Sequence, residues 1–138
     1  MIDKEIIKIA SNTENHGVLN NHTHFSKLKN SICGDEMKIY LILKDEKITN
    51  FKYECESCIY CQASVSLLSR NVKNKSIEKV KKFAEHAKKC FEKNKNSFDK
   101  EWKEFDKIMI KKNISRKECL LLPLNTTLDA LDKKIYEI

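Results

Sequence analysis

The residues of this chain whose types and spacing could do chemistry are three cysteines and an aspartate. Cys33 and Asp35 stand two positions apart, and Cys58 and Cys119 follow at long separations. Three thiolates and one carboxylate are enough donors for a tetrahedral metal site, and soft thiolates favour zinc or iron–sulfur chemistry over magnesium or calcium. Because the donors come from three separate segments, such a site can form only in the folded chain.

Two further cysteines flank Cys58. Cys55, Cys58 and Cys61 form a Cys-x2-Cys-x2-Cys run, which is also typical of bacterial ferredoxin clusters. Such a cluster needs a fourth ligand, and the next cysteine, Cys90, falls on a predicted helix. A redox cluster on this run is therefore a weaker hypothesis. If Cys55 and Cys61 have a role, we expect auxiliary thiols that relay sulfur or form a disulfide.

The elements that must position these residues begin with a helix and a hairpin. Apolar periodicity predicts a helix over residues 3–12, and a polar loop follows over residues 16–31. Residues 37–44 and 48–53 alternate apolar and polar side chains. The polar turn 45–47 between them completes a hairpin signal, so an antiparallel pair of strands is predicted.

Helices are predicted throughout the rest of the chain. A helix over residues 62–70 has small residues in its first turns, which lets its N-terminus approach a bound ion closely. Ser76 is the expected N-cap of a long helix to residue 94. A second amphipathic helix is predicted over residues 98–110. Pro123 fits the first turn of a final helix over residues 124–136.

Together these motifs resemble a known family. Cys33-Gly34-Asp35 before a strand, Cys58 in the pattern Cys-x4-Ala-Ser-x-Ser, and the late Cys119 are similar to the IscU/NifU N-terminal iron–sulfur scaffold superfamily. Residues 12–19 resemble the family's Asn-Pro-x-Asn-x-Gly-x-Leu stretch, with Thr13 in place of the proline. The long separation between Cys58 and Cys119 is similar to that of the SufU-type branch, which carries an extra helical insertion there.

The resemblance implies an α+β fold. We expect a small, mostly antiparallel three-stranded sheet with helices packed on one face, in a single domain over residues 1–138. Two strands are clear from the alternation of side chains, and the third is expected within residues 19–29. The helices within residues 75–112 would form the SufU-like insertion. We expect this insertion to be an extra packing layer, with docking of a partner as the alternative.

The resemblance also implies which residues form the site. Cys33, Asp35, Cys58 and Cys119 would bind Zn²⁺ or a [2Fe–2S] cluster, with Asp35 as the ligand that yields when a persulfide or a cluster enters. Cys33 and Cys119 are the candidate sulfur acceptors, and the sequence does not separate them. Arg116 matches a basic residue of SufU-like proteins and would support the Cys119 thiolate by lowering its pKa.

The chain departs from the family pattern in two places. Glu118 stands where IscU proteins carry a histidine next to the last cysteine, and we expect it to lie outside the ligand set. The loop before Cys58 reads Cys55-Glu56-Ser57, whereas the family usually has glycines there. Because glycine permits a positive φ, we expect the backbone before Cys58 to shift.

The function that the resemblance implies is iron–sulfur cluster biogenesis. In one mode, a scaffold assembles a [2Fe–2S] cluster and passes it to apo iron–sulfur proteins. In the other, a zinc-bound site accepts sulfur from the persulfide of a cysteine desulfurase. Both modes describe a scaffold or sulfur carrier rather than a classical enzyme. The alternative is a structural zinc-binding domain that binds a protein partner without sulfur transfer.

Length and composition agree with one small intracellular domain. The chain has 138 residues and six cysteines, and without a visible secretory signal these are expected to be thiols or metal ligands rather than disulfides. No apolar run is long enough to span a membrane, so we expect a cytoplasmic protein or its equivalent in an organelle matrix or stroma. The net charge of +7 comes from dispersed lysines, so nucleic-acid binding is the weakest hypothesis.

Overall fold

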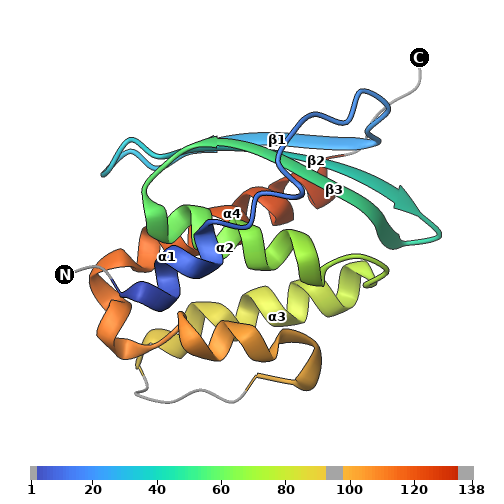
Figure 1. Ribbon diagram of the computed structural model, residues 1–138. Helices are drawn as coiled ribbons and strands as arrows, with labels where there is room; N and C mark the ends of the chain where they lie inside the picture. Colours follow the sequence, from blue (N-terminus) through green and yellow to red (C-terminus); the bar gives the residue numbers. More distant parts are fainter. Residues whose placement is uncertain (1–2, 93–97, 134–138) are drawn as a thin grey trace.

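The fold is built on a three-stranded antiparallel sheet. The computed structural model describes residues 3–92 and 98–133 (Figure 1). Strands β1 (His24–Lys29), β2 (Glu36–Lys44) and β3 (Lys47–Glu56) follow one another in the order β1-β2-β3. Both strand pairs are antiparallel, which confirms the predicted sheet.

Turn chemistry explains how the β2–β3 hairpin closes. Asp45 and Glu46 have φ values of 53° and 62°, and a two-residue hairpin turn of type I′ needs this left-handed backbone at both positions. The predicted hairpin is therefore confirmed, although β3 continues to Glu56 instead of ending near residue 54. The third strand, β1, lies within the predicted range of residues 19–29.

Helices cover one face of this sheet. They are α1 (Lys4–Ala10), α2 (Ile59–Asn71), α3 (Ile77–Lys89) and α4 (Lys117–Asp132). In Figure 1, α1, α2 and α4 lie next to the sheet, and α3 lies on their far side. The predicted α+β class is confirmed. Within the described residues, no helix combines the length and the apolarity that a membrane span needs.

The inner face of the sheet carries the predicted alternation. Met37, Ile39 and Leu41 of β2 are fully buried. They join a single apolar cluster with residues from α1, α2, α3 and α4. This packing fixes the positions of the strand and helix ends.

Side-chain caps explain where two helices begin. The carboxylate of Asp3 accepts the N–H of Glu5 at 2.8 Å, and the hydroxyl of Ser76 accepts the N–H of Lys79 at 3.1 Å. The predicted starts of α1 and α3 are therefore confirmed. After α3 the chain forms a 3₁₀ turn, η1 (Cys90–Glu92), and the end of the predicted helix at residues 93–94 lies outside the described residues.

The starts of α2 and α4 differ from the prediction. α2 begins at Ile59 rather than at residue 62, so Cys58 becomes its N-cap. α4 begins at Lys117, and the prediction that Pro123 opens the final helix is wrong because Pro123 lies inside α4. The predicted continuation to Tyr136 lies outside the described residues.

Leucine burial explains why α4 continues through its proline. A proline inside a helix costs about 3 kcal/mol. The neighbouring leucines, each at most 5% exposed, bury side chains worth about 1.5–3 kcal/mol apiece. The free energy gained by burying these leucines together exceeds the cost of Pro123 inside the helix. The leucines are Leu120, Leu121, Leu122 and Leu124.

The insertion contains a 3₁₀ helix where a second α-helix was predicted over residues 98–110. This helix, η2 (Lys100–Lys107), is interrupted at Trp102, whose φ of −121° is not helical. The break lets the Trp102 ring stack on Phe83 of α3 with ring centres 4.2 Å apart and planes 8° apart. A further 3₁₀ segment, η3 (Lys111–Arg116), leads into α4.

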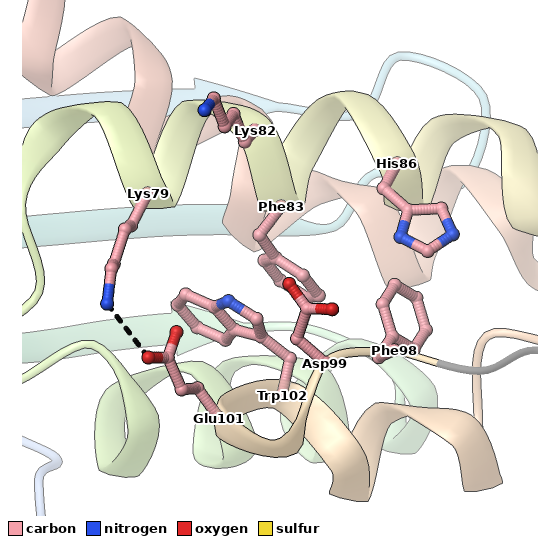
Figure 2. A pocket seen from close by; sticks show the side chains of 8 residues that line it. All are labelled: Lys79, Lys82, Phe83, His86, Phe98, Asp99, Glu101 and Trp102. Carbon is pink, nitrogen blue, oxygen red and sulfur yellow. Dashed lines mark hydrogen bonds and ion pairs between the residues drawn. The ribbon is translucent and has the colours of Figure 1, made fainter.

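The aromatic side chains of the insertion form a packing layer, as predicted. Phe83, Phe98, Trp102 and Phe105 are each at most 4% exposed. Figure 2 shows the pocket of about 340 Å³ beside them, which no cysteine lines. The aromatic layer between α3 and η2 therefore extends the single apolar cluster of the domain, and none of the predicted ligands lines its pocket.

Candidate metal centre

The predicted ligands come from three parts of the fold that meet at one end of the sheet. Cys33 lies in the loop between β1 and β2, and Asp35 stands immediately before β2. Cys58 is the N-cap of α2, and Cys119 lies in the first turn of α4. In Figure 1 the β1–β2 loop and the starts of α2 and α4 lie on the same side of the molecule.

Backbone hydrogen bonds hold the loop that carries Cys33 and Asp35. The N–H of Asn30 donates to the carbonyl of Asp35, and the N–H of Gly34 donates to the carbonyl of Asn30, both at 2.7 Å. Gly34 has a φ of 79°, a left-handed conformation that favours glycine. The turn leaves Cys33 exposed and buries Asp35, which is 7% exposed.

Three of the predicted ligands bring their donor atoms together. The ligand atoms of Cys33, Asp35 and Cys119 all lie within 4.8 Å of one another, and the two sulfurs are 3.7 Å apart. A tetrahedral zinc ion with Zn–S bonds of about 2.3 Å separates its sulfurs by about 3.8 Å. The thiol pair is therefore spaced as such a centre requires.

Asp35 has one carboxylate oxygen engaged and one without a partner. Its Oδ1 accepts the backbone N–H of Cys58 at 3.1 Å. Its Oδ2 is buried and has no hydrogen-bond partner. Burying a carboxylate oxygen in this way is unfavourable unless a cation or a donor meets it, so Oδ2 fits the position of a metal ligand.

Cys58 interacts with Cys119, but the structure does not bring its sulfur into the cluster of three donors. Its sulfur is not one of the three donors that lie within 4.8 Å. It lies beside the thiol of Cys119, whose pKa is raised first by burial and then by Cys58, Cys33 and Asp35. Residues 55–58 hold no positive φ, so this loop forms without the glycines that the family usually has.

The remaining cysteines lie outside the cluster of donors. Cys55 is half-buried at the end of β3, and Cys61 is completely buried in the first turn of α2. Burial raises the pKa of both thiols, and the nearby hydroxyl of Ser57 lowers it in part. Cys90 lies at the end of α3, where its thiol donates to the carbonyl of His86 at 3.2 Å.

Arg116 and Glu118 lie close to Cys119 in sequence, but neither side chain belongs to the cluster of donor atoms. The guanidinium of Arg116 lies over the ring of Tyr60, 5.3 Å from its centre. Arg116 is not among the groups that shift the pKa of Cys119, so its support of that thiolate stays a prediction. Glu118 lines a shallow pocket with Ile32 and Leu122 and is not part of the donor cluster.

A buried serine of the Cys-x4-Ala-Ser-x-Ser motif connects α2 to the start of α4. The hydroxyl of Ser64, completely buried in α2, donates to the carbonyl of Leu120 at 2.6 Å. This bond joins α2 to the first turn of α4, next to Cys119. The small residues of α2 predict a close approach to a bound ion, and their pattern alone does not predict this hydrogen bond to α4.

The fold and the donors define a class of protein: a small α+β domain with cysteine thiols and one aspartate gathered at the end of its sheet. The family model described as the NifU-like N-terminal domain matches residues 1–99. The chain therefore belongs to the family of NifU-like N-terminal domains.

Two relatives with assigned functions are similar to this chain. One is the iron–sulfur cluster assembly scaffold protein IscU of Thermotoga maritima, 28% identical over 133 residues that cover 96% of this chain and 94% of the relative. The other is the zinc-dependent sulfurtransferase SufU of Bacillus subtilis, 33% identical over 67 residues that cover 49% of this chain and 45% of the relative.

Solved structures share the fold. A NifU-like N-terminal protein from Brucella abortus is 22% identical with a TM-score of 0.86, covering 94% of this chain and 90% of that chain. The SufU scaffold protein of Fervidobacterium islandicum AW-1 is 23% identical with a TM-score of 0.85, covering 95% and 96%. At this level of identity the likeness establishes the architecture.

Proposed function

We propose that this protein acts in iron–sulfur cluster biogenesis, as a scaffold or sulfur carrier. The observation that carries the proposal is the convergence of Cys33, Asp35 and Cys119, whose donors lie within 4.8 Å although they come from distant parts of the chain. Membership of the NifU-like family supports it, as do the names of the IscU and SufU relatives. Cys58 completes the proposed set of four ligands.

Exposure favours Cys33 over Cys119 as the acceptor of sulfur. Cys33 is exposed, whereas Cys119 is 5% exposed, and a persulfide carried by a cysteine desulfurase must touch the accepting thiolate. The thiolate of Cys33 attacks the outer sulfur of that persulfide. A new S–S bond forms on Cys33 as the old one breaks, and the desulfurase cysteine leaves as a thiolate.

The donor set fits Zn²⁺ and the iron of a [2Fe–2S] cluster. Zn²⁺ would be held by Cys33, Asp35, Cys58 and Cys119, and when bound it keeps the thiolates ionised. A cluster would be the cargo, passed on to apo iron–sulfur proteins. Asp35 is a hard donor among soft ones, so it is the ligand proposed to yield when a persulfide or a cluster enters.

Mapping the persulfide tests this proposal. The full chain is incubated briefly with a cysteine desulfurase and cysteine, alkylated, and digested for mass spectrometry. We expect the added sulfur on Cys33, and stimulation of the desulfurase that Cys33→Ser abolishes and the control Cys90→Ser retains. Tightly bound zinc without sulfur uptake or stimulation would instead identify a structural zinc domain, and the proposal would fail.

A further inference from the structure

Ile32 presents an apolar side chain to solvent directly beside the exposed thiol of Cys33. Its exposed fraction is 85%, the highest among the large apolar side chains that the structure describes, and the next value is 53% at Ile114. Single exposed apolar residues are common on protein surfaces. What sets Ile32 apart is its position, one residue before the proposed acceptor of sulfur.

Hydrogen bonds fix the turn that holds Ile32 outward. The N–H of Ile32 donates to Oδ1 of Asn30 at 2.9 Å, and the N–H of Gly34 donates to the carbonyl of Asn30 at 2.7 Å. In Figure 1 this β1–β2 loop projects at the end of the sheet. A side chain on a turn that is already ordered loses less conformational freedom when another molecule covers it.

The side chain of Ile32 lines a shallow pocket between the β1–β2 loop and α4. The pocket has a volume of about 270 Å³, and its lining includes the apolar Leu28 and Leu122 and the charged Lys29 and Glu118. Glu118 is exposed, and among the described residues no cation forms an ion pair with it. The pocket therefore suits an apolar side chain that has a cationic neighbour.

Sulfur transfer between two proteins brings the donor chain over Ile32. During the attack, three sulfur atoms lie in a row between the donor cysteine and Cys33. The Cα atoms of a disulfide are about 4.4–6.8 Å apart, and a third sulfur adds about 2 Å. The Cα atom of Ile32 is about 3.8 Å from that of Cys33. Because Asp35 and Cys119 are buried, the donor must approach from the solvent side, where Ile32 lies.

We propose that Ile32 is a specificity residue that makes Cys33 select a persulfide carried by a polypeptide over a small inorganic polysulfide. The inference rests on the proposed function, because it needs Cys33 to accept sulfur. An apolar side chain near the donor cysteine packs against Ile32 and Leu122, and both apolar surfaces leave water. A small polysulfide has no apolar side chain to bury, so it gains nothing from Ile32.

The chemical step is the same for both donors, so binding alone separates them. The thiolate of Cys33 attacks the outermost sulfur of the donor. The new S–S bond forms on Cys33 as the donor's S–S bond breaks, and the donor leaves as a cysteine thiolate or as a polysulfide shorter by one sulfur. Ile32 touches neither bond, and its effect is therefore confined to the polypeptide donor.

The test compares two sulfur donors on the same full-length protein. The protein as purified receives either a persulfide-loaded cysteine desulfurase of the same organism or inorganic polysulfide, each below saturation. The initial rate of sulfur uptake on Cys33 is measured by alkylation and mass spectrometry. In Ile32→Ser we expect a rate about 10-fold lower with the desulfurase and an unchanged rate with polysulfide.

Two further variants control this comparison. Val18→Ser changes an apolar side chain that is 48% exposed in the loop before β1, and we expect wild-type rates with both donors. Ile32→Leu keeps an apolar side chain beside Cys33, so we expect it to retain most of the rate with the desulfurase. Loss of that rate in Ile32→Leu would contradict a role that depends on apolar contact.

Other results separate this inference from the proposed function. An unchanged rate with the desulfurase in Ile32→Ser overturns the inference alone, and so does an equal loss with both donors, which would place the effect on the reactivity of Cys33. A wild-type dimer that becomes a monomer in Ile32→Ser would show that a second copy covers this residue, and would overturn it too. Failure of wild-type Cys33 to take up sulfur from either donor overturns both proposals.

Discussion

The backbone N–H of Cys58 donates a hydrogen bond to Oδ1 of Asp35 over 3.1 Å. This bond joins the N-terminus of α2 to the start of β2. It uses one oxygen of the carboxylate, and the other, Oδ2, stays buried without a partner. One side chain can therefore order the site through Oδ1 and offer a metal ligand through Oδ2.

Asp35→Asn separates these two roles. Asparagine keeps an oxygen that can accept the Cys58 N–H, but it removes the negative donor. We expect the free energy of unfolding of the metal-free protein to change little, while zinc affinity falls about 10-fold or more, measured by competition with a chelator. Glu118→Gln is the matched control, and equal affinities for Asp35→Asn and the wild type would remove Asp35 from the ligand set.

Ser64→Ala tests the bond that positions Cys119. The Ser64 hydroxyl donates to the Leu120 carbonyl in a fully buried setting, so its loss is expected to cost about 1 kcal/mol or more in the free energy of unfolding. Zinc affinity should fall as well, because the first turn of α4 loses its tie to α2.

Ser66→Ala is the control on the same helix. Its hydroxyl donates to the carbonyl of Asn12, away from the donors, at 2.8 Å. We expect a similar loss of stability in urea unfolding and an unchanged affinity for zinc. If both variants bind zinc equally well, the contact between Ser64 and α4 has no part in placing the ligand.

Much of the scaffold was predictable, and particular contacts explain what was not. The alternation of residues 37–44 predicted β2, and Ser76 predicted the start of α3. The sequence does not predict the early start of α2 because cysteine is not one of the residue types that usually cap a helix. In the structure Cys58 makes no side-chain capping bond. The start of α4 was missed because Pro123 is a strong local signal, which the burial of the neighbouring leucines overrides.

The site was predictable only through the resemblance to a family. The separations of Cys33, Cys58 and Cys119 along the chain carry no information about their separation in space. The sequence also did not show that Cys33 is exposed while Cys119 is buried, because exposure depends on how the β1–β2 loop and α4 pack. This difference distinguishes the two candidate acceptors.

Trp102→Ala tests whether the insertion is a separate packing layer. The ring stacks on Phe83 and is 4% exposed, so its removal is expected to cost about 3 kcal/mol or more. Zinc affinity should stay at the wild-type value, since no ligand lines this pocket. Ile114→Ala, at an exposed position, is the control for a substitution at the surface. A loss of zinc binding in the folded Trp102→Ala protein would show that the aromatic layer and the metal ligands are not independent.

Alkaline pH is expected to destabilise the fold through two tyrosines. Burial raises the pKa of Tyr40 to about 12, with the hydrogen bond to Glu54 adding to it, and burial raises that of Tyr53 to about 12. Because these values exceed the ordinary value of 10.0, the folded state holds both protons more tightly. Their stabilising contribution is complete below pH 10 and is lost as the pH rises through 12.

Ultraviolet titration of the phenolates checks this expectation. Tyr40→Phe and Tyr53→Phe should each remove one late-titrating phenol from the wild-type curve. Ionisation of both side chains near pH 10 in the folded protein would show that the β2–β3 region does not bury these hydroxyls as described.

The metal and sulfide content of the anaerobically purified protein tests the proposed centre most directly. We predict stoichiometric zinc, or iron with acid-labile sulfide and the absorbance of a [2Fe–2S] cluster, in the wild type and in Cys90→Ser. The same metal should be lost in Cys33→Ser and Cys58→Ser while both variants remain folded. A protein without metal, or one whose metal survives both substitutions, would contradict a centre built on Cys33, Asp35, Cys58 and Cys119.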